Sequence, residues 1–117
     1  VQPGRRLDLV LLGMGSNGHT ASLFPGLAAV RERERWAMAE HVAEVGGWRI
    51  TLTPPLLNAA AHVLFLVSGA DKAAMLHRVL ENPVDPDALP AQAIVPRDGA
   101  LTWLVDAAAA ASLRGAR

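Results

Sequence analysis

A histidine follows a glycine-rich turn, and that turn follows an apolar run. The apolar run Leu9–Leu12 leads into Gly13-Met14-Gly15-Ser16-Asn17-Gly18, and His19 comes next. The run predicts a parallel strand that is covered on both faces. Because open α/β sheets bind ligands beyond the carboxyl ends of their strands, we expect His19 to lie in a site. Imidazole titrates near neutral pH, so His19 is a candidate general base.

The turn itself supplies backbone groups. Its glycines let the chain turn sharply and let a substrate approach the N–H groups around Gly15–Gly18. The spacing also matches the dinucleotide fingerprint G-x-G-x-x-G, which is a weak signal when it stands alone. That fingerprint needs a full helix after the third glycine, and here Pro25-Gly26 ends any helix after about two turns. We therefore expect no nucleotide cofactor.

Two cations are candidate ligands for an anion. Lys72 lies in the first turn of a predicted helix, where the helix dipole disfavours a cation unless an anion is nearby. A solvent-exposed lysine paired with Asp71 is the alternative. Arg49, next to a predicted strand, is a weaker candidate, and a surface role suits it better. His41, His62 and His77 lack the context of His19, and no His-x-x-x-His spacing occurs, so we expect no metal site.

The composition is that of a small globular chain. There are 117 residues, 51% of them hydrophobic, which predicts a single domain over 1–117. Eleven basic residues balance eleven acidic ones, so neither nucleic acid nor a membrane surface is an expected partner. With no cysteine, no signal-peptide core and no membrane-span-sized apolar run, a cytoplasmic location is expected.

Strands alternate with helices along the chain, which predicts an α/β fold with a mostly parallel sheet. A charged segment over 30–36 is expected at the surface, and a Pro-rich loop over 82–91. Ser68 and Asp106 are the expected N-caps of two helices. Strands are predicted over 7–14, 36–45, 48–53, 62–67 and 101–105, and helices over 20–24, 56–61, 68–81 and 106–113.

The segment Leu9–Gly26 resembles the signature of the 6-phosphogluconolactonases. The resemblance continues through 49–53, 57–60, 65–73 and 101–106 and into the alanine-rich C-terminus. It implies a three-layer α/β/α domain that hydrolyses 6-phosphoglucono-δ-lactone to 6-phosphogluconate in the oxidative pentose phosphate pathway, without a cofactor. The partner is then a small sugar-phosphate lactone. The site residues implied are His19 and Asn17 in catalysis, and Gly15, Ser16, Gly18, Lys72 and Arg49 in substrate binding.

Two departures from the family accompany this resemblance. Family members are about twice as long, and this chain resembles their C-terminal part, which implies an absent N-terminal half with its own phosphate loop. Asn17 stands where the family usually has an acidic residue. An asparagine orients an imidazole but brings no charge to it.

Two other readings stay open. The related glucosamine-6-phosphate deaminases share the glycine-rich turn and the histidine, but they continue through a Phe-Asn-Glu-Pro run where this chain has Ser22-Leu23-Phe24-Pro25. The missing glutamate argues against a deaminase. The other reading is an inactive fragment, or a half that works only with a separate N-terminal chain.

Overall fold

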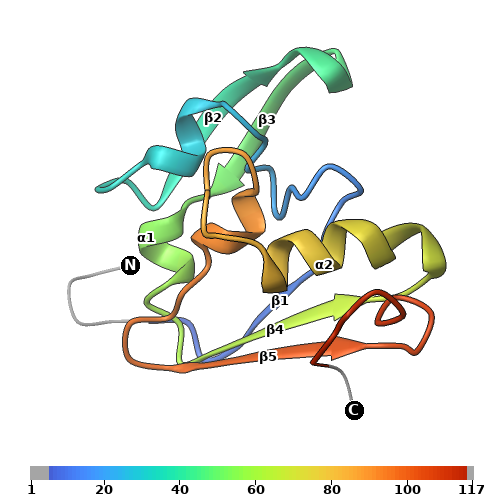
Figure 1. Ribbon diagram of the computed structural model, residues 1–117. Coiled ribbons are helices and arrows are strands. Elements are labelled where there is room, and N and C mark those ends of the chain that lie inside the picture. Colours follow the sequence, from blue (N-terminus) through green and yellow to red (C-terminus); the bar gives the residue numbers. More distant parts are fainter. Residues whose placement is uncertain (1–5, 116–117) are drawn as a thin grey trace.

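The computed structural model describes residues 6–115, which form two sheets joined by short helices. A parallel sheet has the strand order β1-β4-β5, and an antiparallel hairpin pairs β2 with β3 (Figure 1). The α/β class with a parallel sheet is thus confirmed. The strands are β1 (Val10–Leu12), β2 (Ala37–Val42), β3 (Gly47–Leu52), β4 (His62–Val67) and β5 (Ala100–Val105).

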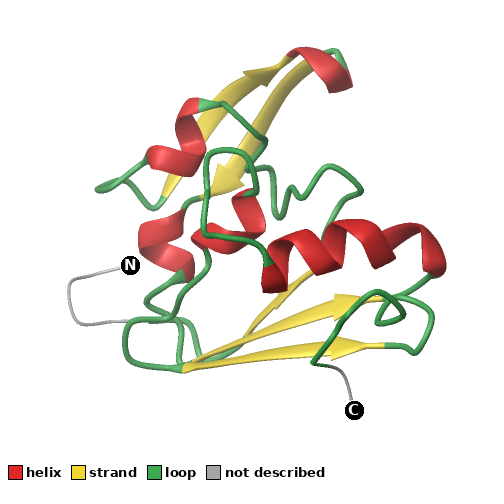
Figure 2. Ribbon diagram, viewed as in Figure 1, coloured by secondary structure: helices red, strands yellow, loops and turns green. Residues whose placement is uncertain are grey.

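Within residues 6–115, two α-helices and four short 3-10 helices connect these strands (Figure 2). The longer helix, α2, lies over one face of the parallel sheet (Figure 1). Its Leu76 and Val79 join Val63 and Phe65 of β4 in the hydrophobic core. The helices are α1 (Pro54–Leu57), α2 (Ala73–Glu81), η1 (Ala28–Arg31), η2 (Ala43–Val45), η3 (Ala70–Lys72) and η4 (Pro90–Ala93).

The opposite face of the parallel sheet is uncovered in the part of the chain that the structure describes. β1 alternates between buried and exposed residues, as expected of a sheet with one solvated face. The expectations of a strand covered on both faces and of a second helix layer are therefore wrong for residues 6–115. Four leucines that are 47–57% exposed mark this open face: Leu9, Leu11, Leu66 and Leu104.

The predicted helix over 20–24 is wrong, and a tight turn takes its place. The Leu23 N–H donates to the Thr20 carbonyl at 2.9 Å, and Ala21 has a φ of 51°. Contacts from outside the segment determine this shape. The Thr20 hydroxyl donates to the Gly13 carbonyl at 2.7 Å, and the Ser22 N–H donates to the Thr51 hydroxyl at 3.0 Å.

Other boundaries also differ from the prediction. The predicted strand over 36–45 ends at Val42 and continues as η2, and the helix predicted over 56–61 is the single turn of α1. Ser68 caps no helix, because η3 precedes α2. Asp106 does accept the Ala109 N–H at 2.8 Å, yet the segment after it forms turns rather than the predicted helix.

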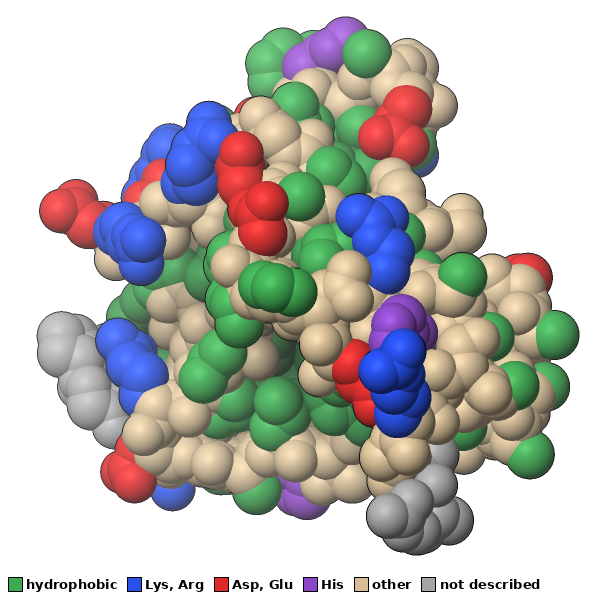
Figure 3. Space-filling model, in the orientation of Figure 1, with side chains coloured by type: hydrophobic (Ala, Val, Ile, Leu, Met, Phe, Trp, Pro, Cys, Tyr) green, Lys and Arg blue, Asp and Glu red, His purple; other side chains and the backbone are tan. Residues whose placement is uncertain are grey.

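In the segment over 30–36 the charges of 31–35 lie at the surface, as predicted, whereas Val30 is buried in the core. Arg35 pairs with Glu32 at 2.9 Å, and Arg31 pairs with Asp87 at 2.6 Å. The hydrogen bonds from Arg35 and from the Glu34 N–H lower the pKa of Glu32 to about 2. Acidic and basic side chains are interspersed over the face in view in Figure 3.

Candidate active site

His19 and Lys72 lie together in an open cleft of about 510 Å³. The cleft is at the carboxyl end of β1, where the sequence analysis expected a site. The remaining lining comes from β1 and the two turns that follow it: Leu11, Leu12, Gly13, Met14, Gly15, Thr20 and Ala21.

Three contacts fix the His19 ring. Its Nδ1 lies 2.6 Å from Asn17 Oδ1. Its ring stacks on Phe24, with centroids 4.6 Å apart and planes 17° apart. A Cβ on Gly15 would overlap the imidazole, so only glycine at this position leaves room for the ring. Phe24 is itself buried, so the ring rests on a fixed surface.

Asn17 connects His19 to a carboxylate that the sequence analysis missed. Its Oδ1 also accepts the backbone N–H of His19 at 3.1 Å, and its Nδ2 donates to Glu44 Oε2 at 3.1 Å. Glu44 belongs to η2 at the tip of the β2–β3 hairpin, 27 residues further along the chain. No local pattern in the sequence links these two positions.

The electrostatics of the cleft favour a neutral imidazole. Partial burial lowers the pKa of His19 below its usual value, and the Lys72 ammonium lowers it further. The Glu44 carboxylate acts in the opposite direction but does not outweigh burial. A histidine of this kind is deprotonated at neutral pH and can accept a proton.

Lys72 stands where a helix follows a strand, as predicted. It ends η3 and is the residue before α2. Its Nζ donates to the Met14 carbonyl at 2.5 Å, which holds the half-buried side chain at the cleft. An ammonium has three N–H groups, so this contact leaves capacity for an anionic ligand.

The amides of the glycine-rich turn are only partly free. The Gly15 N–H donates to the His19 carbonyl at 2.8 Å, and the Gly18 N–H donates to the Gly15 carbonyl at 3.0 Å. These two amides therefore hold the turn together. Within residues 6–115, the amides of Ser16 and Asn17 donate no such bond. Of the predicted binding glycines, Gly15 lines the cleft and Gly18 does not.

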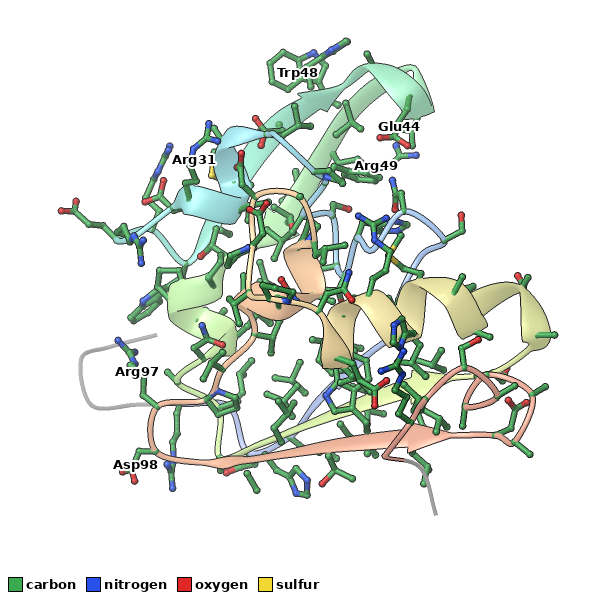
Figure 4. The ribbon with its side chains drawn as sticks, in the orientation of Figure 1. Arg31, Glu44, Trp48, Arg49, Arg97 and Asp98 are labelled. Atoms are coloured by element: carbon green, nitrogen blue, oxygen red, sulfur yellow. The ribbon has the colours of Figure 1, made fainter. Side chains whose placement is uncertain are left out.

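The structure does not bring Arg49 into the cleft. Arg49 lies on β3, exposed, and its nearest hydrogen-bond acceptor is the Trp48 carbonyl at 3.4 Å. Figure 4 shows it on the same side of the hairpin as Glu44. The other histidines have partners elsewhere: His62 bonds Thr102, His77 bonds Glu81, and His41 packs against Trp48.

Residues 6–115 contain neither a metal-binding cluster nor a membrane-spanning helix. No three His, Asp or Glu side chains converge there as a metal site would require. No helix in the described part of the chain has the length and apolar character needed to cross a membrane.

The sequence pattern of one family, described as "Glucosamine-6-phosphate isomerases/6-phosphogluconolactonase", matches residues 2–103. The chain is 48% identical over 109 residues to the 6-phosphogluconolactonase of Rattus norvegicus, covering 88% of this chain and 40% of the rat protein. It is 47% identical over 107 residues to that of Nostoc sp., covering 92% of this chain and 43% of that protein.

Solved structures give the same picture. The devB protein superposes with a TM-score of 0.86 at 33% identity, over 97% of this chain and 48% of that one. The 6-phosphogluconolactonase of Trypanosoma brucei superposes with a TM-score of 0.78 at 32% identity, over 91% of this chain and 42% of that one. In each comparison the chain spans less than half of its relative. The chain belongs to the family of glucosamine-6-phosphate isomerases and 6-phosphogluconolactonases.

Proposed function

We propose that this chain carries the catalytic base and the phosphate anchor of a 6-phosphogluconolactonase. The observation that carries the proposal is that His19, fixed by Asn17, shares one cleft with Lys72. The reaction is the hydrolysis of 6-phosphoglucono-δ-lactone to 6-phosphogluconate, a step of the oxidative pentose phosphate pathway. The lactone is an activated ester, so the reaction needs a base and an anion site rather than a cofactor.

His19 is the general base in this mechanism. Its Nε2 takes a proton from water as the water oxygen attacks the lactone carbonyl. The imidazolium then gives that proton to the ring oxygen as the carbon–oxygen bond of the ester breaks. Acid–base help of this kind contributes about 10²–10⁴-fold to the rate.

The turn and Lys72 position the substrate. Because the amides of Gly15 and Gly18 are already bonded within the turn, those of Ser16 and Asn17 are the remaining donors for the oxyanion. Neither residue lines the cleft, so the turn would need to shift to bring these amides to the substrate. The Lys72 ammonium binds the 6-phosphate and so fixes the carbonyl relative to His19. Arg49 would need to turn toward the cleft to reach the same phosphate.

The chain spans less than half of each relative described above, so we propose that a further segment contributes to the site. We assign the 117 residues to a larger three-layer α/β/α domain, in which a further segment packs against the open face of the parallel sheet. The four exposed leucines of that face support this assignment. A cytoplasmic location stays a prediction, since a rice relative at 40% identity is a probable chloroplastic 6-phosphogluconolactonase.

A complementation assay tests the proposal. The chain is assayed alone and joined to the portion of the Nostoc protein that it does not match, with 6-phosphoglucono-δ-lactone as substrate. We expect the fusion to exceed spontaneous hydrolysis and the His19→Ala fusion to lose that excess. A folded fusion without any excess rate contradicts the proposal. Ammonia release from glucosamine 6-phosphate in the same fusion would identify a deaminase instead.

A further inference from the structure

Glu44 ties the tip of a projecting hairpin to the catalytic turn. The β2–β3 hairpin extends away from the parallel sheet, and η2 lies at its far end (Figure 1). Figure 4 places Glu44 at this end. From there its carboxylate reaches Asn17, whose amide in turn contacts the His19 ring. One continuous chain of hydrogen bonds therefore runs from Glu44 to the imidazole.

We propose that Glu44 is a positioning residue for His19, acting through Asn17. The carboxylate holds the Asn17 amide in the one orientation that leaves His19 Nε2 free to accept a proton. This proposal adds a residue to the proposed lactonase site. It rests on the proposed function only for the identity of the reaction.

The hydrogen-bonding types of Glu44 and His19 determine how the Asn17 amide is oriented. A carboxylate accepts hydrogen bonds and cannot donate them, so the Asn17 group facing Glu44 must be the NH₂ group. The Asn17 group that faces His19 is then the carbonyl oxygen, 2.6 Å from Nδ1. An oxygen acceptor requires a proton on Nδ1, which leaves Nε2 with its lone pair. A flipped amide would present NH₂ to Nδ1 and select the opposite tautomer.

Glu44 also supplies the negative charge that Asn17 lacks. An acidic residue at position 17, usual in the family that the sequence resembles, would fix the tautomer and favour the charged imidazole at once. Here the two roles are divided: Asn17 makes the contact and Glu44 carries the charge. The charged groups that act on His19 are Glu44 from the hairpin and Lys72 from the start of α2, with opposite effects on the pKa of His19.

Nitrogen NMR of the His19 ring tests the positioning role of Glu44 in the 117-residue chain and in the Nostoc fusion. Above the pKa of His19, the neutral ring of the wild type should carry its single proton on Nδ1. Glu44→Ala should raise the Nε2-protonated fraction and lower the pKa of His19. Glu44→Gln should lower the pKa but keep the tautomer, because a glutamine carbonyl still accepts from Asn17. Glu34→Gln, an equal charge change at an exposed site in another segment, should change neither.

An Asn17→Asp background separates positioning from a general effect on the fold. An aspartate accepts from Nδ1 in either orientation, so adding Glu44→Ala there should leave the tautomer unchanged. In the fusion, Glu44→Ala should lower kcat/KM about two- to fivefold, as expected for an exposed charged contact.

The proposal is overturned if wild-type His19 is protonated on Nε2, or if Glu44→Ala alters neither tautomer nor pKa. If Glu44→Ala changes the tautomer in a fusion that has no lactonase activity, the positioning role is supported. Only the proposed lactonase reaction is then contradicted.

Discussion

Substituting Gly15 by alanine should displace the His19 imidazole without unfolding the chain. A Cβ at this position overlaps Nδ1 and Cε1 of His19. Gly15 does not have a positive φ, so the backbone itself accepts alanine without strain. The substitution therefore acts on the position of one ring.

The size of the effect follows from these contacts. Ordinary carbon–carbon contacts are about 3.5–4.0 Å, so the ring must move by roughly 1 Å or more. Losing the Asn17 hydrogen bond and the Phe24 stack together costs about 2 kcal/mol of unfolding free energy, and the stiffer alanine backbone offsets part of it. A base misplaced by about 1 Å can cost about 100-fold in rate. Activity should thus fall far more than stability.

The measurement pairs the lactonase rate of the fusion with the thermal midpoint and the His19 ring signals. Gly13→Ala is the matched structural control: it lies in the same turn, and a Cβ there meets nothing within 4 Å. We expect the ring signals to shift in Gly15→Ala and to stay in place in Gly13→Ala. Unchanged ring signals and an unchanged rate in Gly15→Ala would refute the reasoning.

Four further substitutions have expected outcomes. His19→Ala should remove most of the fusion's lactonase rate above background while its circular dichroism spectrum is kept. Lys72→Ala should weaken binding by about 1.5–3 kcal/mol for the phosphorylated lactone but not for plain gluconolactone, measured as KM. The same change removes a cation that lowers the pKa of His19, so the acid limb of kcat/KM should move to higher pH. Asn17→Asp should also raise that pKa, as NMR titration can check; an unchanged or lowered pKa would show that position 17 does not act on the ring. Leu66→Thr should change the unfolding free energy of the chain by no more than about 0.5 kcal/mol and that of the fusion by more, and equal effects would exclude a covered face.

The elements that the sequence predicted well are those with strong local patterns. The apolar run over 62–67 is β4 with the same boundaries, and the expected strand over 101–105 is β5 with one residue added. Lys72 follows β4 at the start of a helical segment, as predicted, and its Nζ reaches the Met14 carbonyl just after β1. Parallel pairing of neighbouring strands brings their carboxyl ends together regardless of the intervening sequence.

The elements that it predicted wrongly depend on contacts from elsewhere. The turn after His19 is held by Gly13 and Thr51 rather than by its own helix propensity. The alanine-rich C-terminal segment has a high helix propensity, but isolated helices shorter than about 12–15 residues are marginal in water. Ala109 is the fully buried residue of that segment, which offers little apolar surface for packing. Glu44 escaped prediction for the same reason, since only the fold brings it to Asn17.

Leu11 belongs both to the open face of the sheet and to the cleft. A segment that covers that face would therefore also affect activity. Leu11 is 57% exposed on the uncovered face, and it also lines the cleft beside His19. A segment that packs on that face would therefore also wall the cleft. Ligand sites usually enclose most of the ligand surface, which an open cleft of this kind cannot do. We accordingly expect the covering segment to raise lactone affinity even where it contributes no catalytic group. A polar substitution at Leu11 should weaken both the packing of that segment on the sheet and the binding of substrate.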